Sequence, residues 1–209
     1  KRGDNIYCIN RTNIKKNKFL QADITTQNGI NLIEKFFNKK KINNLIFSQR
    51  YRGENNDEEY NLILKATNDV IKISKFKKDD CSIVILGSIA SSTIIGDQNE
   101  TYHFTRGALE TLTKYYAYKL GKQNVRVNCI QPTKIFKPEN KKFFNKQNKD
   151  RKLIEKITPL GKMGSSEDIA NLTEFLTSNK SSYITGTIIP VDGGLRLVGQ
   201  EQIAKLFQK

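Results

Sequence analysis

The stretch "CSIVILGS" (residues 81–88) decides the fold. Its apolar run is unbroken, whereas a strand with one face in water alternates apolar and polar residues. An unbroken run of this length is typical of a parallel strand that is covered on both faces. Two further strand-like runs flank it in the chain, "NNLIFS" (43–48) and "VRVNCIQP" (125–132). The pattern predicts a buried parallel sheet.

Longer segments with helical spacing separate these runs. The predicted helices cover residues 30–40, 57–75, 101–120 and 165–179, and the other predicted strands cover residues 5–10, 19–24 and 186–194. Strands that alternate with helices indicate a doubly wound α/β sheet with helices on both faces, formed by a single domain over residues 1–209. The polar, lysine-rich segment 137–152 is the exception, and we expect a mobile loop or lid there.

Composition limits the classes of protein to which the chain can belong. The 209 residues carry a net charge of +15, but the lysines are spread along the chain and no nucleic-acid-binding motif is present, so we do not expect a nucleic-acid site. No apolar run reaches the length of a membrane span. The three cysteines, Cys8, Cys81 and Cys129, have no metal-site spacing, which favours reduced thiols, a cytoplasmic protein and no bound metal.

Polar residues of interest follow the predicted strands. Ser88 ends the central run, and Tyr102 and Arg106 lie one turn apart on the next helix. With "NCIQP" and "YITGTIIPVDGG" further along, their order and spacing resemble the short-chain dehydrogenase/reductase family. The resemblance covers nearly the whole chain. It is strongest in "SIVILGSIASS", "ALETLTKYYAYKLGKQNVRVNCIQP" and "PLGKMGSSEDIANLTEFLTSNKSSYITG".

This resemblance implies an oxidoreductase that transfers hydride between a nicotinamide cofactor and a carbonyl or secondary alcohol. Ser88 matches the serine that binds the substrate oxygen, and Tyr102 matches the tyrosine that gives or takes the proton. Arg106 stands where the family has lysine. A nearby cation favours the phenolate of a tyrosine, and arginine keeps that charge in a broader, planar group. Two interpretations stay open, a working or weakened active site and a degenerate one.

The resemblance also implies which residues contact the cofactor. Asn10 and Arg11 end the first strand without an acidic residue, which favours NADP over the alternative, NAD. Asp23 matches the residue that contacts the adenine ring, and Ile24 follows it. Pro132 ends a strand of the sheet, and Ile135 matches the residue that packs near the nicotinamide amide. The family also implies a homotetramer or homodimer and a small-molecule substrate.

Several family features are altered or absent. The Gly-rich turn that holds the cofactor pyrophosphate has no counterpart here, so we expect a strand-turn-helix unit before Lys1. Without that central strand the sheet would expose two unpaired strand edges. The supporting asparagine of the family aligns near Thr67, with Asn68 adjacent. The only histidine, His103, is expected to have a surface or packing role and not a catalytic one. These departures motivate a second hypothesis, a catalytically impaired cofactor-binding or structural protein.

Overall fold

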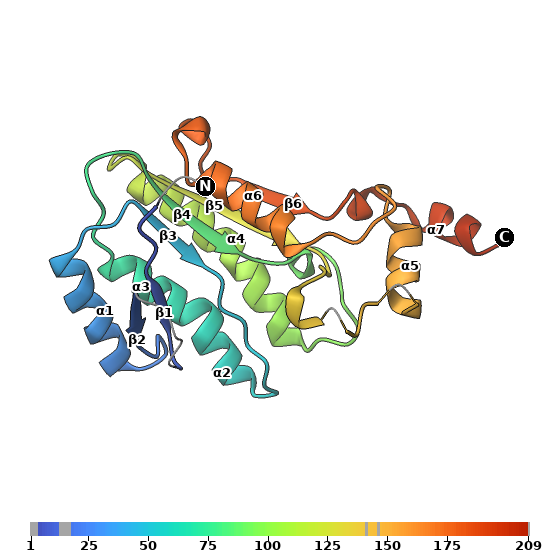
Figure 1. The fold of residues 1–209 in the computed structure, drawn as a ribbon, viewed down its shortest axis with the longest axis horizontal. Coiled ribbons are helices and arrows are strands. Elements are labelled where there is room, and N and C mark those ends of the chain that lie inside the picture. Colours follow the sequence, from blue (N-terminus) through green and yellow to red (C-terminus); the bar gives the residue numbers. More distant parts are fainter. Residues whose placement is uncertain (1–3, 13–17, 141, 146, 209) are drawn as a thin grey trace.

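The computed structural model describes residues 4–12, 18–140, 142–145 and 147–208. Its strands form two parallel sheets (Figure 1). A four-stranded sheet has the order β3 (Asn44–Phe47), β4 (Cys81–Leu86), β5 (Val125–Pro132) and β6 (Ile188–Val191). A two-stranded sheet pairs β1 (Cys8–Asn10) with β2 (Phe19–Gln21). The α/β class and the parallel strands are as the sequence predicts.

The central strand β4 is covered on both of its faces. Because successive side chains of a strand point to opposite faces, Ile83 and Ile85 join one apolar cluster while Val84 joins another. All three side chains are 0 or 1% exposed. The strand β4 is therefore buried on both faces, as its unbroken apolar run predicts.

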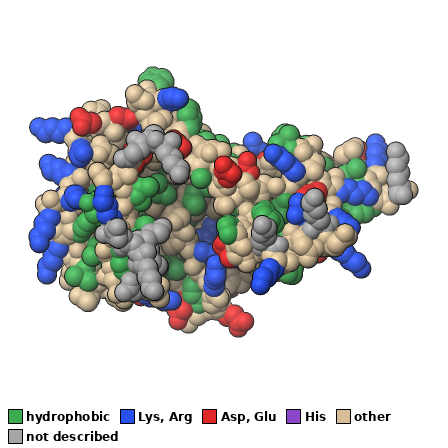
Figure 2. Space-filling view, in the orientation of Figure 1, with side chains coloured by type: hydrophobic (Ala, Val, Ile, Leu, Met, Phe, Trp, Pro, Cys, Tyr) green, Lys and Arg blue, Asp and Glu red, His purple; other side chains and the backbone are tan. Residues whose placement is uncertain are grey.

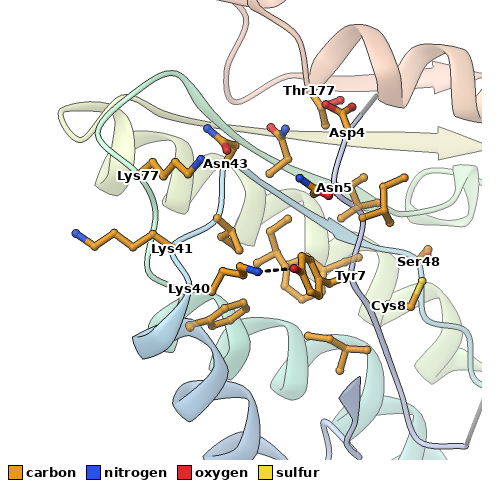
Figure 3. Close-up of a pocket in the computed structure, with 18 of the residues that line it drawn as sticks. Asp4, Asn5, Tyr7, Cys8, Lys40, Lys41, Asn43, Ser48, Lys77 and Thr177 are labelled. Carbon is orange, nitrogen blue, oxygen red and sulfur yellow. Dashed lines mark hydrogen bonds between the residues drawn. The ribbon is translucent and has the colours of Figure 1, made fainter. Parts of the chain in front are cut away.

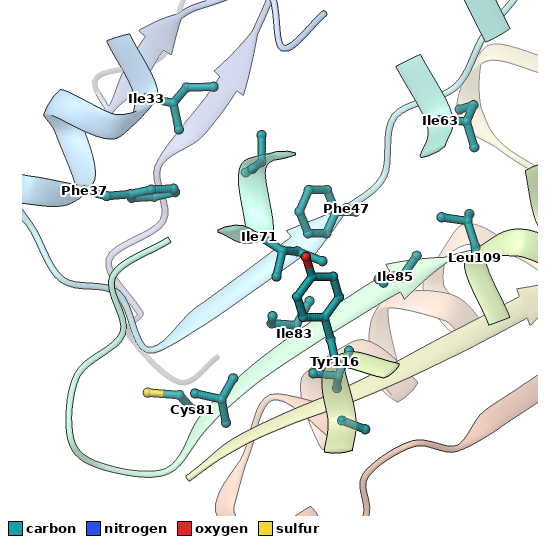
Figure 4. Packing of buried hydrophobic residues seen from close by; sticks show 14 of the residues in the cluster. Ile33, Phe37, Phe47, Ile63, Ile71, Cys81, Ile83, Ile85, Leu109 and Tyr116 are labelled. Atoms are coloured by element: carbon teal, nitrogen blue, oxygen red, sulfur yellow. The ribbon is translucent and has the colours of Figure 1, made fainter. Parts of the chain in front are cut away.

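Helices cover the two faces of the sheet. The larger cluster receives side chains from α1 (Gln27–Lys39), α3 (Ala66–Ile73) and α4 (Glu100–Gly121), among them Ile33, Ile71 and Tyr116 (Figure 4). On the other face, α6 (Ser166–Leu176) contributes Ile169 and Leu176. Each buried isoleucine or leucine stabilises such a layer by about 1.5–3 kcal/mol.

Three segments differ from the sequence prediction. The predicted helix 57–75 is divided into α2 (Asn56–Tyr60), a π-helical turn (Asn61–Lys65) and α3. The predicted loop 137–152 contains a short 3₁₀ turn (Pro138–Asn140), and its last residues start α5 (Lys149–Ile157). A further helix, α7 (Gln200–Phe207), follows the last strand.

The loop prediction was wrong for residues 149–152 because this first turn of α5 is polar, and the apolar residues of the helix, Leu153, Ile154 and Ile157, come after the predicted loop. Polar contacts hold the first turn in place. Asn148 caps its first turn by accepting a hydrogen bond from the Arg151 backbone, and the Arg151 guanidinium donates to the Phe144 carbonyl at 3.0 Å. Side-chain capping of this kind carries no signal in a hydrophobicity pattern.

A groove of about 1780 Å³ lies between the two sheets. β1 lines one side and β3 the other, and each has a strand partner only on its far edge within the described residues (Figure 3). Inside the groove, the Lys40 ammonium donates to the Tyr7 hydroxyl, which lowers the pKa of Tyr7. The two open strand edges that the sequence analysis expects therefore face the same groove.

Charge is distributed without a dominant basic stripe on the face that Figure 2 shows, where Lys and Arg side chains are scattered around the outline. Among the helices that the structure describes, none is both long and apolar enough to cross a bilayer. The three cysteines are free thiols.

Candidate active site

The loop after β4 holds Ser88 at the carboxyl end of the sheet. Gly87 is required before it, because a Cβ atom there would lie 2.9 Å from the Cys129 sulfur of β5. Ser88 is 6% exposed, and its hydroxyl accepts a hydrogen bond from the Ala90 backbone at 3.2 Å. The serine is thus fixed by the turn that it caps, with its own proton free to be donated to another group.

Helix α4 places Tyr102 opposite this serine. Asn99 caps the helix by accepting a hydrogen bond from the Tyr102 backbone at 2.8 Å, which fixes the first turn. The Tyr102 hydroxyl lies 3.3 Å from the Ser88 hydroxyl oxygen. Two hydroxyl groups at this separation can both reach one substrate oxygen.

Arg106 lies one turn further along α4, behind the tyrosine. Its guanidinium carbon lies 4.6 Å from the centroid of the Tyr102 ring, in the geometry of a cation–π contact. Its Nη2 atom lies 3.6 Å from the Glu59 carboxylate of α2, and both side chains are about 5% exposed. The structure therefore brings Ser88, Tyr102 and Arg106 together, with a buried acid as a fourth member.

Glu59 is a residue that the sequence analysis missed. Burial raises the pKa of the Glu59 carboxyl, and the Arg106 guanidinium acts in the opposite direction. A signal was present in the sequence, because Glu59 precedes the buried Ile63 by one helical turn and so belongs to the apolar face of its helix. An acid on such a face is rarely left unpaired.

The side chains at the two positions predicted for the supporting asparagine, Thr67 and Asn68, form hydrogen bonds with groups outside the site. The Thr67 hydroxyl donates to the Ile63 carbonyl and accepts from Gln49. Asn68 accepts from the Tyr116 hydroxyl at 2.8 Å, near the far end of α4. Among the described residues, neither side chain has a hydrogen bond to Ser88 or Tyr102. The asparagine that most closely precedes Thr67 in the chain is Asn61. It begins the π-helical turn, and this turn contacts α4.

His103 has the packing role expected of it. Its Nε2 atom accepts from the Ile95 backbone at 2.8 Å, and its Nδ1 atom lies 2.8 Å from the Asn99 carbonyl. The ring therefore carries its proton on Nδ1 and joins the loop before α4 to the start of the helix.

A second group of predicted residues lies at the ends of β1 and β2. Asn10 accepts a hydrogen bond from the Arg11 backbone at 2.9 Å. Burial acts to raise the pKa of the Asp23 carboxyl, but two hydrogen bonds from Thr25 and the nearby Arg11 charge outweigh it, so the pKa is lowered. Ile24 lines the groove between the sheets. Arg11 and Asp23 are thus neighbours at one strand edge.

The remaining two predicted residues follow the strand β5. Pro132 pairs with Val191 at the end of the sheet. The Cγ2 atom of Ile135 packs against Gly164, and the Ile135 carbonyl accepts from Asn140 at 3.1 Å. Within the described residues, no group of three or more His, Cys, Asp and Glu side chains could hold a metal ion.

Comparisons with known proteins agree with this architecture. The family model described as enoyl-(acyl carrier protein) reductase matches residues 63–196, more than half of the chain. The chain belongs to the short-chain dehydrogenase/reductase family. Among curated proteins, it is 33% identical over 145 residues to an L-xylulose reductase of Mus musculus, covering 66% of this chain and 57% of that protein.

A tropinone reductase homologue of Arabidopsis thaliana is 35% identical over 118 residues, covering 56% of this chain and 44% of that one. The chain therefore spans about half the length of the curated relatives that it matches.

Solved structures show the same fold. A short chain dehydrogenase from Leptospira borgpetersenii with bound NAD+ superposes with a TM-score of 0.72 at 28% identity, covering 90% of this chain and 82% of that one. The aldohexose dehydrogenase of Thermoplasma acidophilum gives a TM-score of 0.76 at 22% identity, covering 92% and 84%.

Proposed function

We propose that this protein is an NADP-dependent oxidoreductase that interconverts a small carbonyl compound and a secondary alcohol in the cytoplasm. The observation that carries the proposal is the separation of 3.3 Å between the Tyr102 and Ser88 hydroxyl groups at the carboxyl end of the sheet. Ligands bind at this end in open α/β sheets. Membership of the family supports the reaction class.

Each residue of the site has a role in this reaction. The cofactor, when bound, supplies or accepts the hydride. Ser88 donates a hydrogen bond to the substrate oxygen, and Tyr102 passes a proton to that oxygen during reduction and accepts it during oxidation. Arg106 lies with its guanidinium against the ring of Tyr102 and fixes the orientation of the phenol. Charge that develops on the substrate oxygen is thereby met by two hydroxyl donors that are already in position.

The residues around β1 fit a cofactor with a phosphate on its adenosine ribose. Arg11 is an exposed cation, and no acidic residue lies between it and Asp23 in the chain. A guanidinium matches the geometry of a phosphate, whereas NAD is held by a carboxylate at this place.

Removal of the Arg11 charge tests the cofactor preference. In Arg11→Ser we expect the affinity for NADPH to fall about 10- to 150-fold, because a charged hydrogen bond contributes about 1.5–3 kcal/mol. The affinity for NADH should be unchanged. Fluorescence titration of both nucleotides against the natural protein measures this. Lys18→Ser is the control, because Lys18 is an exposed cation directly before β2. Equal losses for the two nucleotides would contradict a phosphate contact.

The groove between β1 and β3 supports the proposal of a further strand-turn-helix unit. A strand placed there would satisfy both open edges and would join the two sheets into one. The turn after that strand would then lie at the same end of the sheet as Ser88 and would supply the backbone amides that hold a pyrophosphate. Purification of the natural protein and sequencing of its N-terminus tests whether such a unit precedes Lys1.

A second function is favoured by one specific observation. Arg106 is paired with Glu59 and is nearly buried, whereas the lysine that the family resemblance implies at this place also contacts the nicotinamide ribose. This arrangement fits a catalytically impaired protein that binds the cofactor without hydride transfer. Nucleotide binding without turnover on any carbonyl or acyl thioester substrate would favour it over the enzyme.

We also propose that the protein forms a homodimer or homotetramer through α2 and α4. Tyr60 of α2 stacks on Phe104 of α4 with ring centroids 6.3 Å apart, although both rings are at least 40% exposed. Such a paired aromatic surface is typical of interfaces. In Phe104→Glu we expect the assembly to dissociate to monomers, measured by sedimentation equilibrium. Phe143→Glu, another aromatic that is 58% exposed, is the control, and a parental mass in Phe104→Glu would contradict this interface.

A further inference from the structure

The pair formed by Glu59 and Arg106 is unusual in its burial. The Glu59 side chain is 5% exposed and the Arg106 side chain 6%, and their charged atoms lie 3.6 Å apart. A buried charge without a partner is strongly disfavoured, and each of these groups is the partner of the other. The pair joins α2 to α4 directly behind the Tyr102 ring.

The guanidinium meets the tyrosine through the ring face. Its carbon lies 4.6 Å from the ring centroid, and within the described residues it donates no hydrogen bond to the phenol oxygen. Arg106 therefore acts on Tyr102 through its charge. The size of that effect depends on how far the Glu59 carboxylate cancels the charge of the guanidinium, because both side chains are nearly buried and water screens them little.

We propose that Glu59 is a positioning residue for the reaction: its carboxylate holds Arg106 against the Tyr102 ring and neutralises the guanidinium there. This inference rests on the proposed oxidoreductase function. In this arrangement the Tyr102 phenol lies beside a neutral ion pair instead of a bare cation when it exchanges its proton. Glu59, which does not touch the substrate, then sets the pH range in which Tyr102 exchanges its proton.

The other titratable groups around this pair do not replace Glu59. On α4, His103 contacts the edge of the Tyr102 ring but has both nitrogen atoms engaged, and Glu110 accepts a hydrogen bond from Gln131. On β5, burial raises the pKa of Cys129 to about 12, so this thiol is neutral under ordinary conditions. Glu59 is the one acid that forms an ion pair with Arg106 in the described part of the chain.

The test is the pH profile of Glu59→Gln. The substitution changes the charge of the pair from zero to +1 while it keeps the side-chain shape. A bare cation favours phenolate, and Tyr102 must be phenolate to accept the proton of the alcohol. The acidic limb of kcat/KM for alcohol oxidation should therefore move to lower pH, by about one to three pH units. Glu58→Gln is the matched control, since Glu58 is adjacent and exposed and accepts from Tyr51 at 3.0 Å. It should leave the profile in place.

A rescue variant separates positioning from a merely structural role. In Glu59→Gln/Arg106→Gln the pair is neutral again, and the profile should return toward the parental pH even though activity is reduced. If Glu59 only supported the fold, Glu59→Gln would lower stability without moving the profile. If Glu59→Gln does not fold, Glu59→Asp keeps the charge and displaces it, so kcat should fall with no shift along the pH axis.

A measurement without turnover distinguishes failure of this inference from failure of the proposed function. Tyrosinate absorbance is titrated for each protein and for its Tyr102→Phe derivative, and the difference isolates one phenol. In the Glu59→Gln background this difference signal should rise at lower pH than in the parent. A shift without any turnover would support the pair and refute the oxidoreductase. No shift in either assay would overturn the role of Glu59, whether or not the protein is active.

Discussion

Tyr102→Phe should lower kcat/KM for carbonyl reduction by about 10²- to 10⁴-fold, which is the usual contribution of one general acid. The variant loses only the hydroxyl that lies 3.3 Å from Ser88. Its ring remains, and with it the contact to the Arg106 guanidinium at 4.6 Å. The loss should therefore appear in the chemical step, with the fold and the cofactor affinity retained.

Steady-state oxidation of NADPH over a panel of ketones and acyl thioesters measures this effect. Tyr118→Phe removes the same atom from a side chain of the same helix that is 90% exposed, and it should keep parental rates. Parental activity in Tyr102→Phe would refute the proposed proton transfer. If the parent binds NADPH but shows no turnover, Arg106→Lys becomes informative, because activity gained by that variant would identify a degenerate site.

Much of the sheet could be predicted from the sequence because its signals are local. The apolar residues of β4 and β5 predict that both strands are buried, without any knowledge of the elements that lie beside them. The places of Ser88 and Tyr102, after a strand and at the start of a helix, could be predicted for the same reason, but their roles as site residues came only from the family resemblance. Their separation of 3.3 Å depends on the tertiary fold and could only be expected by resemblance.

The parts that could not be predicted depend on contacts between distant segments. Glu59 and Arg106 are 47 positions apart, from 59 to 106. The place of Glu59 on the apolar face of its helix indicates a buried partner, but nothing in either helix indicates which residue that partner is. The π-helical turn at residues 61–65 leaves no mark in the apolar spacing of its helix. The division of the strands into two sheets is also a long-range feature: one edge of β1 has no strand partner among the described residues, so β1 and β2 form a sheet of their own.

A further buried cation gives the largest expected effect on stability. Arg126 lies in β5 and is 6% exposed. Its guanidinium donates to the carbonyls of Leu176 and Ser178 at 3.0 and 3.2 Å, at the end of α6. It also donates to the Ser181 hydroxyl and to the Asp80 carboxylate, each at 2.9 Å. One side chain thus joins the sheet, the segment before β4 and the end of α6.

We expect Arg126→Met to lower the free energy of unfolding by about 3–5 kcal/mol, as measured by urea denaturation, because the variant loses several buried hydrogen bonds from a charged donor. Methionine fills similar space but donates no hydrogen bonds, and each hydrogen bond from a charged donor contributes about 1.5–3 kcal/mol. The Leu176 carbonyl keeps the Ser82 hydroxyl as a donor and the Ser178 carbonyl keeps the Ser181 hydroxyl, so the loss comes from the guanidinium bonds themselves. Because α6 covers one face of β4 and β5, the loss should spread to the cluster that contains Val84 and Ile130.

Asp80→Asn separates the two kinds of contact that Arg126 makes. The Asp80 side chain is 38% exposed, so solvent screens its charge and the ion pair should contribute less than about 1 kcal/mol. If the carbonyl bonds are the main contribution, Asp80→Asn will be nearly neutral while Arg126→Met is severe. Equal losses in the two variants would mean instead that the ion pair holds the segment before β4 in place, and that the bonds to α6 form only once that segment is fixed.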